Sequence, residues 1–248
     1  MEKNILLLIK IFNKEEYADA FIEKGELFCR TLGDFKKCDD NDGRRDKFEA
    51  VTHCFQPDQV NFVINFKDID GAKKSLPIEK LDGPIFIQNN CYDRLNLFCM
   101  YAVISPFFEE TYETEEERIA AIQKINAMLK EVCTLSHEAL SLGPFAVVVY
   151  QVRDFVDMVL KEARNRNWIC SNQLVDYYDP DTFNGSFNPV ETIFKKRYIY
   201  QHQNEYRFAF DSLEQEGVKT IHLGSLSDIA FKLPSKEISE RVQLKLAE

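Results

Sequence analysis

Apolar residues alternate with polar ones in short runs along the whole chain, and this pattern predicts many short strands. The clearest alternation lies in 204–210, where Tyr206, Phe208 and Phe210 share one face and Glu205 and Arg207 share the other. We therefore expect a central strand with its aromatic face in the core. The strand-like runs are 4–12, 26–31, 60–66, 84–88, 95–104, 145–150, 192–200, 204–210, 218–223 and 229–232.

Other segments carry apolar residues at helical spacing. They are 13–24, 115–140 and 152–167, and a short polar helix follows the last strand. Thr114 and Glu117 have the spacing of a capping box at the start of the second helix. Because helices and strands alternate in no regular βαβ order, the sequence predicts an α+β fold. We expect a single domain over 1–248, with a mixed, mainly antiparallel sheet flanked by helices and a helical insertion near 115–140.

Composition narrows the class of protein. The chain has 248 residues, is 45% hydrophobic and carries a net charge of −10, which suits a folded, acidic protein. Such a charge argues against binding to duplex nucleic acid, which needs a basic face. No apolar run reaches the length of a membrane-spanning helix. We expect no membrane association.

Cysteine and histidine usage points to a reducing compartment without a metal centre. The seven cysteines are an odd number without a CxxC pair, so we expect reduced thiols and a cytoplasmic location. The four histidines form none of the common zinc motifs, so no metal is expected. The phosphate-binding loop, the dinucleotide-binding glycine pattern and the GxSxG elbow are also missing from the sequence.

Two segments combine charged residues with aromatic anchors. The first is 21–49, in which Arg30 lies on a predicted strand and a charged loop ends in Arg44–Glu49. The second is 194–210, in which Gln203, Glu205 and Arg207 follow one another at every second position. Charges on a central strand are costly unless they are paired or face a cleft. The sequence therefore predicts that Glu205 and Arg207 line one pocket with Arg30 and part of the 44–49 loop. The alternative for each segment is an ordinary set of ion pairs.

The two segments resemble a group of poorly characterised bacterial and phage cytosolic proteins. The early part of the resemblance is an Asp-x-Phe-Glu motif, matched by Asp46, Phe48 and Glu49. The late part is a Lys, a Gln-x-Glu and an Arg, matched by Lys195, Gln203, Glu205 and Arg207. Together they cover less than a fifth of the chain.

A second resemblance is to ADP-ribosyltransferases, whose catalytic glutamate commonly lies in a Gln/Glu-x-Glu motif on a late strand. Gln203-Asn204-Glu205 has that form, and Arg30 resembles the Arg that holds the dinucleotide in these enzymes. The resemblance implies NAD as cofactor and transfer of ADP-ribose to a macromolecular target, in the setting of phage–bacteria conflict. Glu205 and Gln203 would then be catalytic, and the cofactor-binding residues would be Arg30, Arg207, Arg44 and Glu49. The chain departs from the pattern because it has no Ser-Thr-Ser on a middle strand.

An interaction protein of the same conflict is the alternative hypothesis. Six glutamates lie within 109–117, and together with the net charge they suit a protein partner with a basic surface. Such a defence or counter-defence factor would need no catalytic residue. Release of nicotinamide from NAD would distinguish the two hypotheses.

Overall fold

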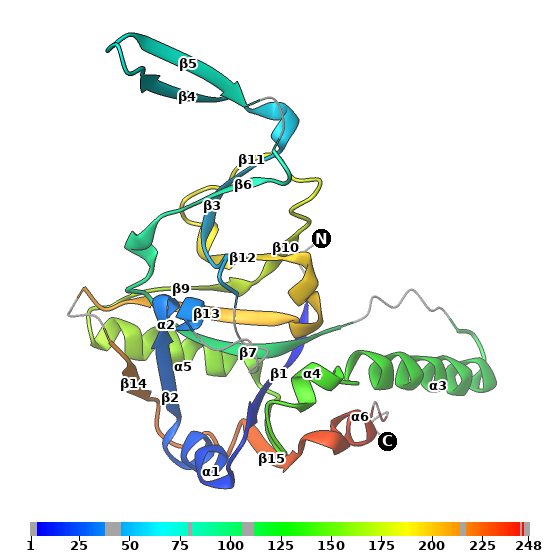
Figure 1. The fold of residues 1–248 in the computed structure, drawn as a ribbon. Coiled ribbons are helices and arrows are strands. Elements are labelled where there is room, and N and C mark those ends of the chain that lie inside the picture. The colour runs from blue at the N-terminus through cyan, green and yellow to red at the C-terminus, as the bar shows by residue number, and fades with distance from the viewer. Residues whose placement is uncertain are drawn as a thin grey trace.

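An eight-stranded antiparallel sheet forms the centre of the molecule in the computed structural model (Figure 1). The structure describes residues 4–37, 46–78, 81–105, 112–213, 217–243 and 245. The strand order is β14-β2-β7-β1-β8-β15, and β13 and then β9 extend the sheet from the other edge of β7. The strands of this sheet are β1 (Ile5–Phe12), β2 (Glu26–Thr31), β7 (Asn96–Ile104), β8 (Phe145–Val149), β9 (Ile169–Leu174), β13 (Glu205–Asp211), β14 (Lys219–His222) and β15 (Ala230–Pro234).

Smaller sheets stand apart from the central one. They comprise the parallel pair β10 (Asp176–Tyr178) and β12 (Lys195–Arg197), the antiparallel set β11 (Gly185–Ser186), β3 (Val51–Phe55) and β6 (Ile85–Gln88), and the hairpin of β4 (Phe62–Lys67) and β5 (Lys73–Ile78). The predicted α+β fold with a mainly antiparallel sheet is thereby confirmed, and the parallel pairing of β10 with β12 lies outside the central sheet. The single-domain organisation stays a prediction.

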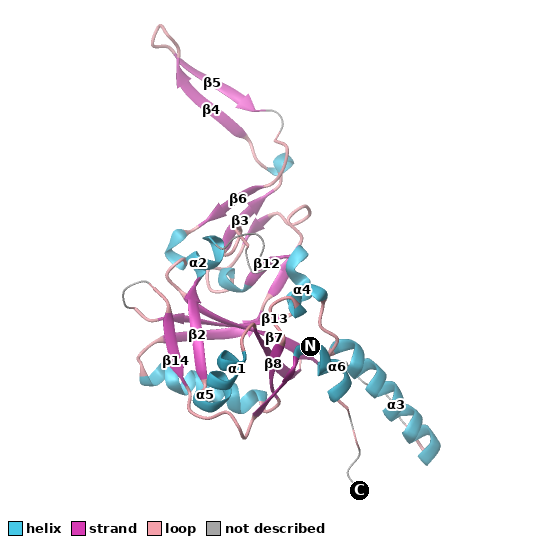
Figure 2. Ribbon diagram, turned by 60° about the horizontal axis from the view of Figure 1, so that its bottom comes forward, coloured by secondary structure: helices cyan, strands magenta, loops and turns pink. Residues whose placement is uncertain are grey.

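Helices cover both faces of the central sheet (Figure 2). On one face, Phe21 of α1 and Phe155 of α5 pack in a core with Phe208 of β13. The opposite face is covered in two separate places, by a cluster around Leu135 and Ile238 and by another around the η4 turn. The helices are α1 (Glu15–Lys24), α2 (Leu32–Lys37), α3 (Glu115–Val132), α4 (His137–Leu140), α5 (Val152–Asn165) and α6 (Ile238–Arg241), and the short 3-10 turns are η2 (Pro57–Gln59), η3 (Asn90–Tyr92), η4 (Thr192–Phe194), η5 (Tyr198–Gln203) and η6 (Ser235–Glu237).

Three sequence predictions change in detail. The run 60–66 does form a strand, but β4 belongs to a projecting hairpin and not to the central sheet. The predicted strand 192–200 is wrong over most of its length, because only Lys195–Arg197 is extended and two 3-10 turns flank it. The predicted helix 115–140 is two helices, and the first projects from the body (Figure 1). None of the described helices is long and apolar enough to span a membrane.

Two strands, β2 and β1, pair with different parts of the same edge of β7. β2 pairs with its start, where Arg30 is opposite Leu97, and β1 pairs with its end, where Ile9 is opposite Tyr101. The two strands diverge between these points. Lys10 lies in the gap, and its Nζ donates a hydrogen bond to the carbonyl oxygen of Cys99 at 2.6 Å. The sheet therefore opens between β1 and β2, and this opening positions the site.

Candidate functional site

β13 carries the central charges of the site. Tyr206, Phe208 and Phe210 point into the core of α1 and α5, so Glu205 and Arg207 lie on the opposite face, as the alternation predicted. Both charged residues are buried: Glu205 is 6% exposed and Arg207 is 1% exposed. Charges buried to this extent need partners, because an unpaired charge inside a protein costs several kcal/mol.

Arg207 finds its partners in Glu49, Glu205 and a backbone carbonyl. Its Nη1 and Nη2 contact the two carboxylate oxygens of Glu49 at 3.0 and 3.1 Å, which is a bidentate pair. Its Nε donates to Oε1 of Glu205 at 2.6 Å, and Nη1 also donates to the carbonyl oxygen of Ile193 at 2.6 Å. The guanidinium is thus committed to protein groups. We infer that Arg207 positions the two carboxylates, and its predicted contact with a cofactor stays a prediction.

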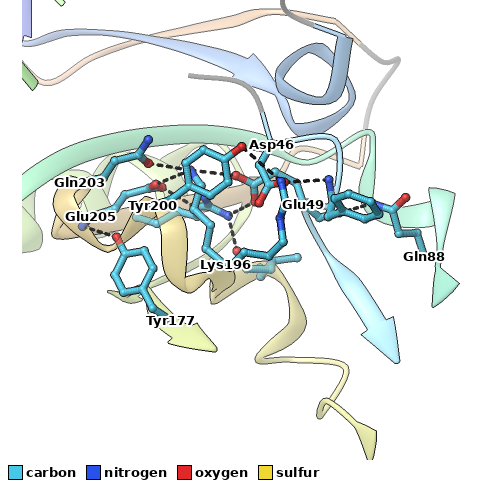
Figure 3. A network of polar contacts seen from close by, with 12 residues as sticks. Asp46, Glu49, Gln88, Tyr177, Lys196, Tyr200, Gln203 and Glu205 are labelled. Carbon is cyan, nitrogen blue, oxygen red and sulfur yellow. Dashed lines mark hydrogen bonds and ion pairs between the residues drawn. The ribbon is translucent and has the colours of Figure 1, made fainter. Parts of the chain in front are cut away.

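Lys196 of β12 completes the cluster (Figure 3). Its Nζ lies 2.7 Å from Oε1 of Gln203, 3.2 Å from Oε2 of Glu205 and 3.1 Å from Oε1 of Glu49. Lys196 is 3% exposed. Sequence reasoning missed it and matched the late Lys of the resemblance to Lys195, whose Nζ instead pairs with Asp176. We call Glu49, Lys196, Gln203, Glu205 and Arg207 the charge cluster.

The early Asp-x-Phe-Glu motif attaches the loop to this cluster. Asp46 is fully buried, and its Oδ1 accepts hydrogen bonds from Nη2 of Arg197 at 2.8 Å and from the Phe48 amide at 2.9 Å. The Arg197 guanidinium also lies 4.4 Å from the centre of the Phe48 ring. The backbone carbonyl of Glu49 accepts a bond from Nε2 of Gln88 at 2.8 Å. Asp46 and Phe48 therefore fix the turn that delivers Glu49 to Arg207.

The protonation states of the cluster follow from its geometry. Burial alone would raise the pKa of Glu205, but the Arg207 and Lys196 charges outweigh burial and lower that pKa well below its usual range. The pKa of Glu49 is lowered by the same balance. Burial lowers the pKa of Lys196, and the charges of Glu205 and Glu49 overcome this and raise it above its usual value. The cluster thus holds two carboxylates and two cations, all ionised at neutral pH.

A cleft of about 770 Å³ opens over this cluster. It lies at the divergence of β1 and β2, where it is lined by Lys10 and Arg30 as well as by Glu49, Glu205 and Arg207. Aromatic residues from four elements add to the walls, namely Tyr17 of α1, Phe28 of β2, Phe35 of α2 and Tyr101 of β7. Small-molecule sites are commonly of this size and combine apolar walls with a few polar groups.

The structure thus brings most of the sequence-predicted site residues into one cleft. Gln203, Glu205, Arg207, Glu49 and Arg30 all line it. The remaining one, Arg44, is outside the described residues, as are Cys38 and the Glu109–Glu110 part of the acidic segment. That these residues act on a ligand stays a prediction.

Arg30 and Glu205 lie at different parts of the cleft. Leu97 is opposite Arg30 on one side and opposite Ala209 on the other, so Arg30 is two strand spacings from β13. Glu205 lies four residues along β13 from Ala209. With about 4.8 Å between strands and about 3.4 Å per residue, the Cα atoms of Arg30 and Glu205 are roughly 17 Å apart. A ligand that contacts both side chains therefore bridges two separate parts of the cleft.

Other chemistries find less support in the described part of the chain. No group of three or more His, Cys, Asp or Glu residues there could hold a metal ion. Cys99 lines the cleft, but burial raises the pKa of its thiol to about 12, so it is a poor nucleophile at neutral pH. The cleft therefore offers a fixed carboxylate, two peripheral cations and aromatic walls.

Comparison of the chain with protein-family models, curated proteins and solved structures finds no match.

Proposed function

We propose that the cleft binds NAD and that the protein transfers ADP-ribose to a macromolecular acceptor. The observation that carries this proposal is the Glu205 carboxylate, which Arg207 and Lys196 keep ionised on the wall of a cleft large enough for a nucleotide. A carboxylate held in this way is suited to a reaction in which positive charge develops on the ligand.

The reaction has such a charge-developing step. The bond between the ribose C1′ and the nicotinamide nitrogen breaks, and its electron pair leaves with nicotinamide. The ribose becomes oxocarbenium-like, and the carboxylate of Glu205 would stabilise the positive charge at C1′. An acceptor nucleophile then forms a bond to C1′ and releases a proton. Gln203, which lines the same cleft, would help to orient the ribose.

The remainder of the cleft suits the remainder of the dinucleotide. Arg30 would hold the pyrophosphate, since a guanidinium binds phosphate oxygens well. The separation of roughly 17 Å between the Cα atoms of Arg30 and Glu205 leaves room for the two side chains and for part of a dinucleotide between them. Phe28 is 55% exposed and Tyr17 is 46% exposed, so their rings are accessible for stacking on a base.

Two measurements test the proposal. Chromatography follows the release of nicotinamide from NAD, and calorimetric titration measures the binding of NAD. We expect Glu205→Gln to abolish release and Arg30→Ala to weaken NAD binding. Glu162→Gln is the matched control, because Glu162 is also paired with an arginine but lies on α5, across the sheet from the charge cluster. It should keep full activity.

Stability must be measured beside activity, because Glu205 also belongs to a buried cluster. Glu205→Asp keeps the negative charge but shortens the side chain, so it separates loss of chemistry from loss of fold. A folded protein that neither binds NAD nor releases nicotinamide would refute the proposal. A Glu205→Gln variant that releases nicotinamide at the wild-type rate would refute the role of Glu205.

A further inference from the structure

The β4–β5 hairpin projects from the body as an isolated arm (Figures 1 and 2). Among the described strands, these two pair only with each other. Two-stranded hairpins are marginally stable in water unless another layer covers them. The structure therefore raises the question of what covers this one.

The arm is strongly amphipathic. Phe62, Ile64 and Phe66 lie on one face of β4, and register places Ile78 and Leu76 of β5 opposite the first two of them. The other face carries Val63 and Asn65 of β4 with Pro77 and Ser75 of β5, and Ser75 Oγ donates to Asn65 Oδ1 at 2.5 Å. We call the face of Phe62, Ile64, Phe66, Leu76 and Ile78 the apolar arm face.

This face is exposed to solvent. Phe62, Ile64 and Phe66 are 47%, 43% and 45% exposed, and Leu76 is 54% exposed. A large apolar side chain presents on the order of 200 Å², so these four leave roughly 400 Å² of neighbouring apolar surface uncovered. Patches of this size on a soluble protein commonly mark an interaction site.

We propose that a second copy of this chain covers the apolar arm face, with the two arms packed face to face about a two-fold axis. An apolar face can pack against its own copy, as an isologous interface requires. Two such faces with their rims would bury on the order of 1,000 Å², which is where specific protein interfaces begin. The distance between the two sheets would be about 10 Å, as in other face-to-face sheet packing.

The charges at the two ends of the arm agree with this arrangement. The described tip carries three lysines, Lys67, Lys73 and Lys74, against two aspartates, Asp68 and Asp70. Asp58, in the turn at the base, is exposed. If the arms pack antiparallel, the tip of one lies over the base of the other, and a net positive end meets a negative one. The arm contributes no residue to the cleft, so this proposal is independent of the proposed function.

Sedimentation of the full chain over a range of concentrations tests the proposal. We expect a dimer whose dissociation constant rises by at least roughly a hundredfold in Ile64→Lys, because each dimer would bury two unpaired ammonium groups. Val63→Lys is the matched control, since Val63 is 45% exposed on the other face of the same strand, and it should leave the dimer intact.

A cross-link gives a second measurement that does not depend on the lysine variant folding correctly. With the exposed native thiol removed by Cys91→Ser, Ile64→Cys should form a disulfide-linked dimer on mild oxidation, and Val63→Cys should not. A wild-type chain that stays monomeric at high concentration would overturn the proposal. So would a dimer that Ile64→Lys leaves unchanged, or a monomer whose apolar arm face binds a different protein.

Discussion

The charge cluster should contribute far more to the free energy of unfolding than a surface ion pair does. Replacing Arg207 by Met keeps a long side chain of similar reach but removes the charge that faces Glu49 and Glu205. Two buried carboxylates then share Lys196 as their only cation within the cluster. Breaking a buried pair in this way costs about 3–5 kcal/mol, a large part of the free energy of unfolding of an ordinary protein.

The pH dependence of this loss has a definite sign. In the wild type the folded pKa values of Glu49 and Glu205 lie below their unfolded values, so their stabilising effect is present above about pH 4.5 and is lost as the pH falls further. In Arg207→Met one carboxylate should have a folded pKa above its unfolded value. The folded variant then binds a proton that the unfolded chain does not, and lowering the pH stabilises it. The gap between variant and wild type should narrow by about 1.4 kcal/mol for each pH unit between pH 5 and the new pKa.

Urea unfolding followed by tryptophan fluorescence measures the free energy of unfolding of the variant and the wild type at about pH 7.5 and about pH 5. Trp168 is the only tryptophan, is 8% exposed and packs against Phe210 on the same strand as Arg207. Arg94→Met is the control, because Arg94 pairs with Asp211 at the exposed end of β13 and should cost less than about 1 kcal/mol. A loss below about 1 kcal/mol in Arg207→Met, or a loss that does not shrink at the lower pH, would refute the reasoning.

Two further predictions concern other parts of the fold. Gly143→Ala should lower the free energy of unfolding by more than about 2 kcal/mol in the same urea assay. The φ angle of Gly143 is +154°, and a Cβ there would lie 2.1 Å from the carbonyl oxygen of Phe12. Gly83→Ala is the control, because a Cβ at Gly83 meets nothing within 4 Å, and it should change this free energy by less than about 0.5 kcal/mol. The six described cysteines are all free thiols, and the exposed Cys91 should react first with a thiol reagent. Cys29 should stay unreacted until the protein unfolds, because burial raises the pKa of its thiol well above the usual value. Peptide mapping after brief labelling measures the second, and early labelling of Cys29 would contradict it.

The sequence predicted elements well where local pattern decides them. The aromatic alternation of Tyr206, Phe208 and Phe210 placed the charged face of β13 correctly, because period two is a property of any strand. The capping box of Thr114 and Glu117 is also present at the start of α3. Both signals lie within a few residues of one another and need no knowledge of tertiary contacts.

Placement of a strand in a sheet is a different matter. The run 60–66 has the alternation of a half-buried strand, and β4 does have an apolar face, yet that face has no layer over it in the described chain. Alternation indicates that one face of a strand is buried, but it does not indicate which element buries that face. If a second copy covers it, the pattern and the projecting arm have one common cause.

Lys196 shows why the site was only partly predictable. The sequence predicted one strand over 192–200 and did not single out Lys196. In the structure only Lys195–Arg197 is extended, between two 3-10 turns, and the Lys196 ammonium group lies in the charge cluster. A charge balance would have indicated it. Glu49 and Glu205 are two buried carboxylates, Arg207 alone leaves an excess negative charge, and a second buried cation is needed.

Buried clusters of this kind raise the question of why the chain keeps charges where apolar residues would serve stability at least as well. The position of the cluster supplies the reason that we favour. Arg207 and Lys196 tie the 46–50 turn to β13 through Glu49, and the same two cations hold the Glu205 carboxylate ionised on the wall of the cleft, where a ligand would lie. The two roles separate by mutation. Arg30 lines the cleft on β2, two strand spacings from β13 and at the opposite part of the cleft from Glu205, so Arg30→Ala should change ligand affinity while leaving the pH dependence of unfolding as in the wild type. Loss of stability in Arg30→Ala as large as in Arg207→Met would mean that the cleft is held together by its charges and is not shaped around a ligand.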